Sequence, residues 1–450
     1  MNDITAIFAF LKYCLGSKED MSMVIAGMDW QELYSFASKQ ALLGLCLEGI
    51  ERLGKEYPEE LKQNPIGREL VMNWMGKAQQ IRRQNMKVNA VASKLFAMLR
   101  EDGMRCCVLK GQGNALMYPN PYSRTPGDID VWIDASRERI MEYAQKKFEL
   151  GDDIRLQHLK TSLDGVPVEL HFFPCSMNNP IYHARLQKWF KRNADLQCSN
   201  VVSLPDGIGA IAIPTTAFNV IYQLTHLYHH FFDEGIGMRQ IIDYFLVVCD
   251  FYKVYQNSSK ITPSLFTIKE GSTSHPDPLT LRGEGGNRPT RCSEPLRSKD
   301  GGASKPSPDC AGWDRLSIEG DNSAGSTTVV TSYASTALDV VQRELKYLGL
   351  WKFAGAVMYV LKEVLGLAED KMIVPVDEKR GRLLLAEILD GGNFGRHFSK
   401  YGGFTHQSMG KKYFLKIWRN MHFVRYYPAE ALCEPLFRTW HFFWRLKYKK

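Results

Sequence analysis

Apolar residues recur at helical spacing through the first hundred residues of the chain. Ile4, Ile7 and Leu11 repeat every three or four positions, which is the period of one face of an α-helix. The same period continues as far as Leu99. The pattern therefore predicts a helical region over residues 1–103.

The pattern then changes to short apolar runs of strand length. Asp164-Gly165 joins the last two runs, and this residue pair suits a two-residue hairpin turn. A helical stretch over 136–150 lies between the second and third runs. Together these features predict a compact α/β unit over residues 104–200. The expected strands cover residues 105–110, 129–133, 158–163 and 166–172.

Helical spacing returns after this unit. It predicts a helical region at 201–256 that completes a cleft, and a C-terminal helical region at 334–450. Residues 257–333 are rich in Ser, Gly, Pro and Thr and have almost no apolar period, which is typical of a disordered or inserted segment. The expected fold class is α+β, with a small mixed β-sheet core flanked by N-terminal and C-terminal helical regions.

Composition excludes several classes of protein. The chain of 450 residues is long enough for two to three domains, and 44% hydrophobic with 24% charged residues excludes a largely disordered protein. The N-terminus lacks the basic segment and cleavage site of a signal peptide, and no window has the ~20 apolar residues of a membrane span. The ten cysteines form no Cys-x-x-Cys pair, so we expect reduced thiols and a cytoplasmic location.

The positive charge of the chain is concentrated at one end. Of the net charge of +8, residues 411–450 contribute ten Lys and Arg against two acids, together with twelve aromatic residues. Such a tail could bind an anionic partner such as a nucleic acid or a membrane surface. We favour an amphipathic helical subdomain with solvated Lys and Arg, because charge runs usually mark exposed faces.

Candidate chemistry begins with a pair of acids on the second expected strand. Asp128 and Asp130 lie two residues apart and therefore project from the same face of a strand. On the last strand, alternation leaves Glu169 and His171 on the polar face. Three carboxylates held together need a cation, and oxygen ligands suit Mg²⁺ or Mn²⁺. We therefore predict Asp128, Asp130 and Glu169 as metal ligands and catalytic residues.

A glycine-containing turn precedes this acidic pair. In Lys110-Gly111-Gln112 the glycine lets the backbone approach a phosphate, and the free N–H groups of a following helix favour anions. Lys110 and Arg124 add positive charge, the latter through a bidentate contact. The sequence predicts nucleotide binding by Lys110, Gly111, Gln112 and Arg124.

These motifs resemble the polymerase-β-like nucleotidyltransferase superfamily, and more closely an uncharacterised nucleotidyltransferase family common in bacterial genomes. The resemblance covers about residues 80–255, although Gln112 stands where the superfamily usually has Gly or Ser. Four stretches carry it in order: Leu109-Lys110-Gly111, Arg124-x-x-Gly-Asp128-Ile-Asp130, Val168-Glu169-Leu170-His171 and Gly237-Met-Arg239-x-x-x-Asp243.

The resemblance implies a transferase that moves a nucleoside monophosphate from a nucleoside triphosphate, with ATP expected, to the hydroxyl group of a small molecule or protein. Two Mg²⁺ ions would bridge Asp128, Asp130 and the phosphates, and Glu169 would complete one shell. Two other readings stay open. One is a non-catalytic, antitoxin-like nucleotide-binding regulatory module, and the other is a nucleic-acid polymerase or tRNA-modifying enzyme that uses the basic tail.

Two further groups of polar residues are expected on the helices after residue 215. One helical face carries three histidines, His226, His229 and His230. Three interpretations are open: a polar wall of the cleft, histidines of the core with satisfied hydrogen bonds, or a zinc site. Arg239 and Asp243 are one helical turn apart. Their spacing fits an intrahelical ion pair, while the family pattern implies that Arg239 faces the nucleotide.

Overall fold

A computed structural model describes residues 3–149, 155–256, 326–398 and 408–448 of the chain. The chain divides into two compact units. One is formed by residues 1–259 and 330–450, and the other by residues 260–329. Most of the second unit, and with it most of the expected insertion at 257–333, lies outside the described residues. The first unit contains the elements described below.

The N-terminal region is helical, as the apolar period predicts. Its last helix, α6, covers 34 residues, and Gly103 follows it with φ +70°, a backbone conformation that suits glycine after a helix. The helices are α1 (Asp3–Cys14), α2 (Ser22–Ala26), α3 (Trp30–Lys39), α4 (Leu43–Glu56), α5 (Pro58–Gln63) and α6 (Arg68–Glu101).

A four-stranded sheet follows, and its strands confirm the four expected runs. The order is β1-β2-β4-β3, in which β2 and β4 are parallel and the two outer pairs are antiparallel. Asp164 and Gly165 both have positive φ at the β3–β4 turn, as a type I′ hairpin requires. The strands are β1 (Cys106–Leu109), β2 (Ile129–Ile133), β3 (His158–Leu163) and β4 (Val166–His171).

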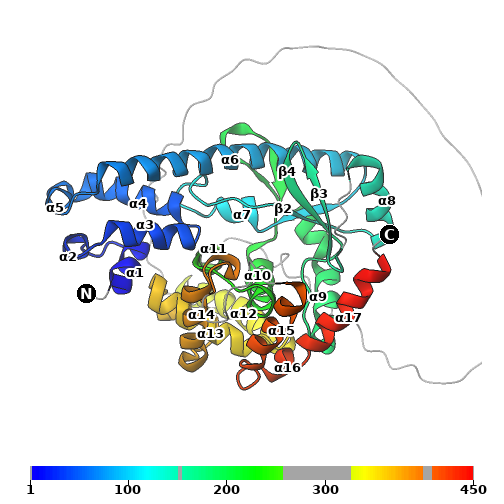
Figure 1. Ribbon diagram of the computed structural model, residues 1–450. Coiled ribbons are helices and arrows are strands. Elements are labelled where there is room, and N and C mark those ends of the chain that lie inside the picture. The colour runs from blue at the N-terminus through cyan, green and yellow to red at the C-terminus, as the bar shows by residue number, and fades with distance from the viewer. Residues whose placement is uncertain (1–2, 150–154, 257–325, 399–407, 449–450) are drawn as a thin grey trace, which may run out of the picture. The chain divides into compact units, whose positions relative to one another are not determined.

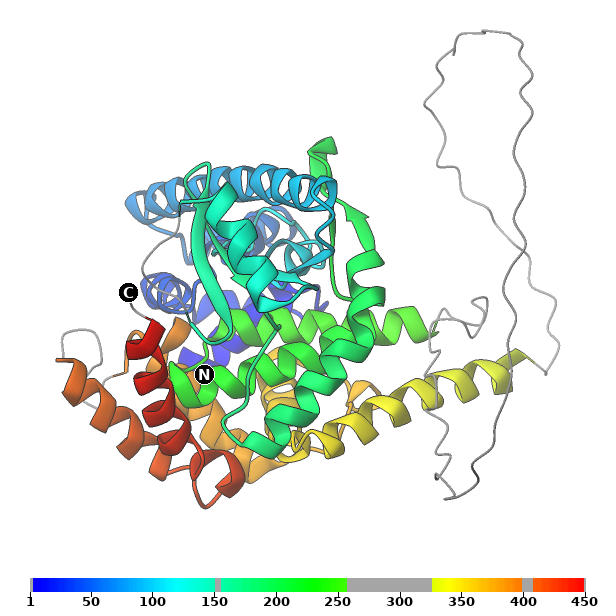
Figure 2. The same cartoon turned by 90° about the vertical axis from the view of Figure 1, so that its right-hand side faces the viewer.

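The two faces of this sheet differ in chemistry because side chains alternate along each strand. Ile129 and Val131 of β2 join Val168 and Leu170 of β4 in a core beneath α6 and α8 (Arg137–Lys147). Figures 1 and 2 show α6 running across this face. The opposite face carries Asp130, Trp132, Glu169 and His171. This face is polar around Asp130, Glu169 and His171, while Trp132 packs against Phe190 and Phe218 in the other apolar core.

The region after residue 200, expected to be helical throughout, begins with a short hairpin. The expected helical stretch at 216–255 is two helices rather than one, because the chain turns through Gly235 and Gly237. The elements are α9 (Pro180–Ser199), β5 (Val201–Ser203), η1 (Pro205–Gly207), β6 (Ala210–Ala212), α10 (Thr216–Asp233) and α11 (Met238–Gln256).

C-terminal helices share a core with the N-terminal ones. Buried side chains of α1, α10, α11 and α13 belong to one apolar cluster, and the Gln40 side chain at the end of α3 donates to the carbonyl of Ile388 over 3.0 Å. The elements are α12 (Ser326–Tyr347), α13 (Trp351–Leu365), η4 (Glu369–Lys371), α14 (Glu378–Gly391), η5 (Asn393–Gly395), α15 (Met409–Met421), α16 (Pro428–Ala431) and α17 (Glu434–Tyr448).

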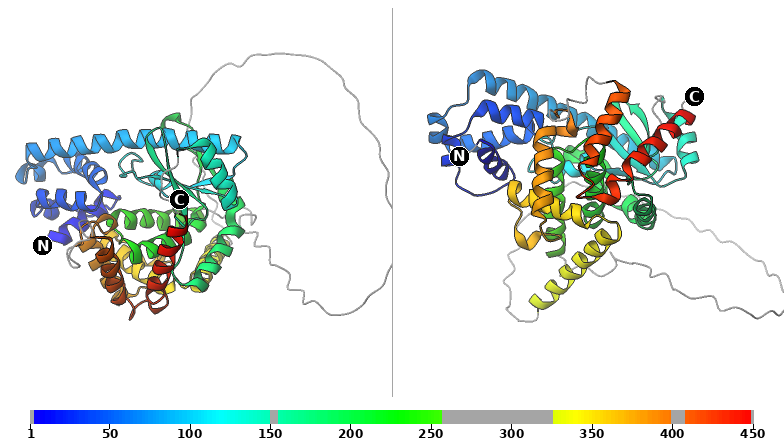
Figure 3. Two further views of the ribbon diagram at one scale, coloured as in Figure 1. Left: turned by 45° about the vertical axis from the view of Figure 1, so that its right-hand side comes forward. Right: turned by 60° about the horizontal axis from the view of Figure 1, so that its bottom comes forward.

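The basic tail folds into the last three helices, of which α15 and α17 pack together (Figure 3). Glu430 of α16 is 1% exposed. Its carboxylate accepts the backbone N–H groups of Asn178 and Asn179 just before α9. Burial raises the pKa of Glu430 to about 7. Among the described residues, no helix is long and apolar enough to cross a lipid bilayer.

The buried carboxyl of Glu430 makes stability depend on pH. Because its pKa is higher in the folded than in the unfolded chain, the folded state binds the extra proton, and stability falls as pH rises from about 4.5 to about 7. Glu430→Gln keeps an acceptor without the charge. Urea unfolding at pH 4.5 and at pH 8 measures the difference in stability between the variant and the natural protein. We expect this difference to shift by roughly 2–4 kcal/mol in favour of the variant at the higher pH. Equal pH slopes for the two proteins would contradict this.

Candidate active site

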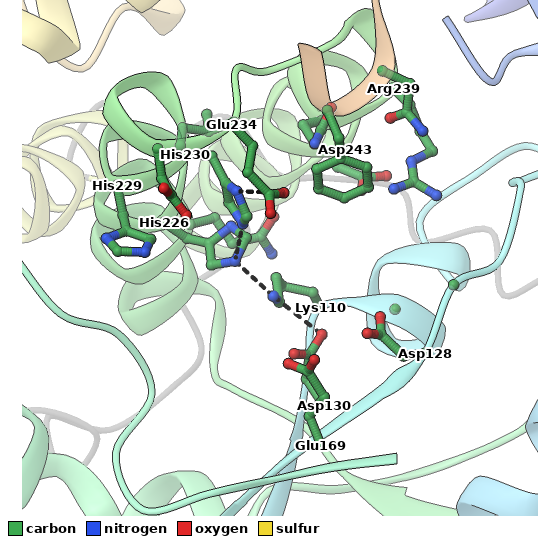
Figure 4. Close-up of a pocket in the computed structure, with 18 of the residues that line it drawn as sticks. Lys110, Asp128, Asp130, Glu169, His226, His229, His230, Glu234, Arg239 and Asp243 are labelled. Carbon is green, nitrogen blue, oxygen red and sulfur yellow. Dashed lines mark hydrogen bonds and ion pairs between the residues drawn. The ribbon is translucent and has the colours of Figure 1, made fainter. Parts of the chain in front are cut away.

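A cleft of about 870 Å³ opens on the polar face of the sheet. Residues from β2, β3 and β4 form one wall, and residues from α10, the start of α11, η5 and α15 line the rest. Figure 4 shows acidic side chains of the sheet facing histidines of α10. The predicted residues Lys110, Gly111, Arg124, Asp128, Asp130, Glu169 and Arg239 all line it.

Three carboxylates converge in this cleft as predicted. Asp130 and Glu169 are register partners on the parallel strands β2 and β4, and Asp128 precedes β2 by one residue. Enclosure in the cleft, together with the negative charges of Asp130 and Glu169, raises the pKa of Asp128 to about 6. Lys110 opposes this shift, and a cation bound beside Asp128 would oppose it further.

Lys110 supplies part of the missing charge. Its backbone has φ +52° between β1 and the short helix α7 (Gly111–Ala115), a conformation that costs energy in a residue with a side chain. This turn directs Nζ to within 3.1 Å of Asp130 Oδ2 and 2.7 Å of His226 Nε2. The strained backbone of Lys110 therefore places its ammonium group beside the Asp130 carboxylate.

A second cation, His171, lies on the other side of Asp130. Its Nε2 donates to Asp130 Oδ1 over 2.9 Å and lies 3.5 Å from Glu169 Oε2. Although burial opposes it, these two carboxylates raise the pKa of His171 to about 9. Burial also acts on Asp130, but Lys110 and His171 hold the pKa of that carboxyl well below its usual range. Asp130 is therefore charged and contacted on both oxygens.

Arg124 forms a buried ion pair with Asp243 of α11. Its Nε and Nη2 donate to the two carboxylate oxygens over 2.8 and 2.7 Å, and Tyr118 donates to the same carboxylate over 2.8 Å. The expected intrahelical pair between Arg239 and Asp243 is therefore replaced by a contact across the fold. The Arg124 guanidinium already makes its bidentate contact with Asp243, so a bidentate contact with a phosphate stays a prediction.

Arg239 is a buried cation of the cleft with few partners. It is 6% exposed, Nη1 donates to the Thr125 carbonyl over 2.9 Å, and Nε has no hydrogen-bond partner. Burial and the charge of Arg124 lower the pKa of Arg239 to about 10. The guanidinium also lies over the ring of Phe394, 5.4 Å from its centre. A buried, under-compensated arginine of this kind suits an anionic ligand.

Gln112 lies in the expected turn at the start of α7, but its side chain lies outside the cleft. Its side chain is 3% exposed and donates to Asn89 of α6, on the side of α7 away from the cleft. The Gln112 side chain therefore takes no part in the cleft, and nucleotide binding through the backbone N–H groups of this turn stays a prediction. The reason is helix rotation, because successive residues at the start of α7 point about 100° apart.

The histidines of α10 line the cleft, which agrees with the polar-wall reading. His226 and His230 face each other with their Nε2 atoms 3.1 Å apart, and His230 Nδ1 lies 3.8 Å from Glu234 Oε2 (Figure 4). Burial and the charge of Lys110 lower the pKa of His226 well below its usual value. His226 therefore acts as a neutral acceptor for Lys110 rather than as a charged group.

A family of uncharacterised nucleotidyltransferases matches residues 26–255, about half of the chain. This match extends from α2 to the last turn of α11 and includes the whole sheet. The chain belongs to this family. The fold class and the family resemblance expected from the sequence are both confirmed.

An antigenic nucleotidyltransferase-like protein from Paracoccidioides brasiliensis is similar at 17% identity and a TM-score of 0.25, over 36% of this chain and 75% of the other. A comparison with curated proteins gave no match.

Part of the cleft was not predicted from the sequence. Lys412 and Lys416 of α15 line it, although the basic tail was expected to carry solvated charges or to bind a separate anionic partner. Lys416 and Arg438 each lie 3.1 Å from Asp233 at the end of α10. Lys412 and Lys416 are spaced one helical turn apart in the sequence. Only the tertiary structure shows that both line the cleft.

Close backbone contact fixes another wall of the cleft. A Cβ on Gly395, which has φ +62°, would lie 1.9 Å from the Glu234 carbonyl oxygen. We expect Gly395→Ala to lower the unfolding free energy by roughly 2 kcal/mol, from left-handed strain and this clash. Gly410→Ala is the matched control, because nothing lies within 4 Å of its Cβ position. Chemical denaturation measures both, and equal stability of the two variants would refute the packing argument.

Proposed function

We propose that the chain transfers a nucleoside monophosphate from a nucleoside triphosphate, with ATP expected, to the hydroxyl of a small molecule or protein. The observation that carries this proposal is the convergence of Asp128, Asp130 and Glu169 in one cleft that is also lined by Lys110, Arg239, Lys412 and Lys416. All eight cysteines in the described part of the chain are free thiols. A cytoplasmic location, where triphosphates are abundant and thiols stay reduced, is part of the proposal.

The residues present fit a pair of divalent cations. The three carboxylates offer oxygen ligands of the kind that Mg²⁺ and Mn²⁺ prefer, and the raised pKa of Asp128 reflects negative charge that a cation would relieve. Asp128, Asp130 and Glu169 would hold the ions. When bound, such ions would neutralise phosphate oxygens and orient the acceptor beside the phosphate.

The protein's own groups supply the remaining parts of the reaction. Lys110 and Arg239 are placed to contact phosphate oxygens, and Gly111 lets the chain approach them closely. The acceptor oxygen forms a bond to the α-phosphorus while the bond between the α- and β-phosphates breaks. Pyrophosphate carries away the electron pair, and a carboxylate of the trio accepts the hydroxyl proton.

A second function of a different class is a non-catalytic, antitoxin-like nucleotide-binding module. The observation that favours it is the engagement of both Asp130 oxygens by Lys110 and His171. Such a module would bind a triphosphate without consuming it.

One experiment separates the two. Purified protein is incubated with Mg²⁺, cell extract and triphosphates labelled either in the α- or in the γ-phosphate. Transfer of the α-label alone supports nucleotidyl transfer, and transfer of the γ-label would refute it. Label transfer that survives the double change Asp128→Ala and Asp130→Ala would also refute the proposed site. Triphosphate binding without any transfer would favour the regulatory module.

A further inference from the structure

Two histidines lie beside Glu169 on the cleft face of the sheet. His158 of β3 is the register partner of His171 of β4, and Glu169 precedes His171 by two residues, so all three share one face. The two imidazole rings are 5.0 Å apart, measured between their centres. Neighbouring strands thus bring two nitrogen donors and one carboxylate together.

The spacing of these three groups matches the edges of a metal coordination shell. His158 Nδ1 lies 3.2 Å from Glu169 Oε2, and His171 Nε2 lies 3.5 Å from the same oxygen. All three potential ligand atoms lie within 4.8 Å of one another. Ligands about 2.0–2.1 Å from a tetrahedral ion are separated by about 3.3 Å, which the two separations from Glu169 Oε2 already match.

His158 provides an independent indication of a ligand. It is 8% exposed, and neither ring nitrogen makes a hydrogen bond of acceptable geometry. A buried polar ring without partners is unfavourable, and such groups are rare in folded proteins. A metal ion bound at a ring nitrogen would supply the missing partner.

The histidines of α10 are less suited to this role. His226 accepts a hydrogen bond from Lys110, and His230 lies against His226. Within the described parts of the chain, the group formed by His158, Glu169 and His171 is the one cluster of such residues with metal-ligand spacing.

We propose that His158, Glu169 and His171 bind a divalent transition-metal ion of the Zn²⁺ and Co²⁺ class, in preference to Mg²⁺, and that binding releases the Nε2 proton that His171 otherwise donates to Asp130. Imidazole nitrogen favours such ions, whereas Mg²⁺ prefers oxygen ligands and retains its waters. The inference deepens the proposed function, because it changes the chemical class of the ion that Glu169 holds there. Asp128 and Asp130 would still provide an oxygen-only site beside it.

Cobalt spectroscopy on the full-length protein tests the proposal. Chelator-treated protein is titrated with Co²⁺, and visible d–d absorption reports binding. We expect one Co²⁺ per chain, displaced by equimolar Zn²⁺ but not by a large excess of Mg²⁺. Absence of binding, or displacement by Mg²⁺ as readily as by Zn²⁺, would overturn the proposal.

Substitutions locate the ion. His158→Ala should weaken Co²⁺ binding on the order of 100-fold, while His229→Ala, a cleft histidine outside the cluster, and Asp128→Asn should leave binding unchanged. His158→Cys should add a thiolate-to-cobalt charge-transfer band, which direct coordination requires. Unchanged binding by His158→Ala, or loss of binding only in Asp128→Asn, would assign the ion to the carboxylates instead. Circular dichroism checks that each variant is folded.

This test is independent of catalysis. Cobalt binding with the cysteine band, in a protein that transfers no label, would retain the metal site and reject the proposed reaction. Label transfer with Mg²⁺ in a protein that binds no Co²⁺ would retain the reaction and reject the metal site.

Discussion

Asp130→Asn is expected to lower the rate of label transfer at least about 1000-fold, equivalent to roughly 4 kcal/mol of transition-state stabilisation. Asp130 is the central member of the carboxylate trio, because it pairs in register with Glu169 and contacts both Lys110 and His171. Asparagine keeps the size of the side chain and an oxygen acceptor for His171, but removes the charge that would hold a cation. The measurement is transfer of the α-phosphate label under saturating triphosphate.

Asp134→Asn is the matched control for this prediction. Asp134 directly follows β2, four residues from Asp130, but its carboxylate pairs with Arg105 and does not line the cleft. We expect the control to change the transfer rate less than about threefold, since it removes the same charge from the same strand without touching the site. Equal losses in the two variants would mean that the reduced activity of Asp130→Asn reflects damage to the sheet rather than to the site.

Asp243→Ala is expected to lower the unfolding free energy by roughly 3–5 kcal/mol, the largest stability effect among these predictions. Asp243 and Arg124 are 4% and 6% exposed, and the carboxylate accepts both guanidinium N–H groups as well as the Tyr118 hydroxyl. Its removal leaves the charge of Arg124 buried without a counterion. Urea denaturation at neutral pH measures the effect.

An exposed pair of the same kind provides the control. Glu378 and Arg382 form an ion pair one helical turn apart, with side chains 62% and 70% exposed. We expect Glu378→Ala to cost less than about 1 kcal/mol, because water and salt screen surface pairs. The double change Arg124→Met and Asp243→Leu should recover much of the stability lost in Asp243→Ala, since it buries neither charge alone. A double variant as unstable as Asp243→Ala would contradict the electrostatic explanation.

Local sequence rules predicted the sheet well. The four strands appear where short apolar runs stand between turn residues, and Asp164-Gly165 forms the expected turn. Alternation along β2 and β4 also placed Asp130 and Glu169 on a polar face, because the side-chain period of a strand is fixed at two. The pairing of β2 with β4 was not predicted, since parallel neighbours are joined by long segments that carry no local signal of register.

Helical parts of the site were harder to predict. The sequence placed His226, His229 and His230 on one face but left open what that face contacts, and it did not show that the Gln112 side chain donates to Asn89. A helical period identifies an apolar stripe, yet the rotation of each polar residue toward a neighbour depends on packing.

The sequence by itself determined the strands, the turn and the spacing of Asp128 and Asp130, since these depend on residues close together in the chain. Only the tertiary structure decided that Asp243 pairs with Arg124, that His158 lies beside Glu169 and that lysines of α15 reach the cleft. Each of these contacts joins residues from separate elements. Their formation depends on how whole helices and strands bury their apolar faces, and spacing along the chain does not record that arrangement.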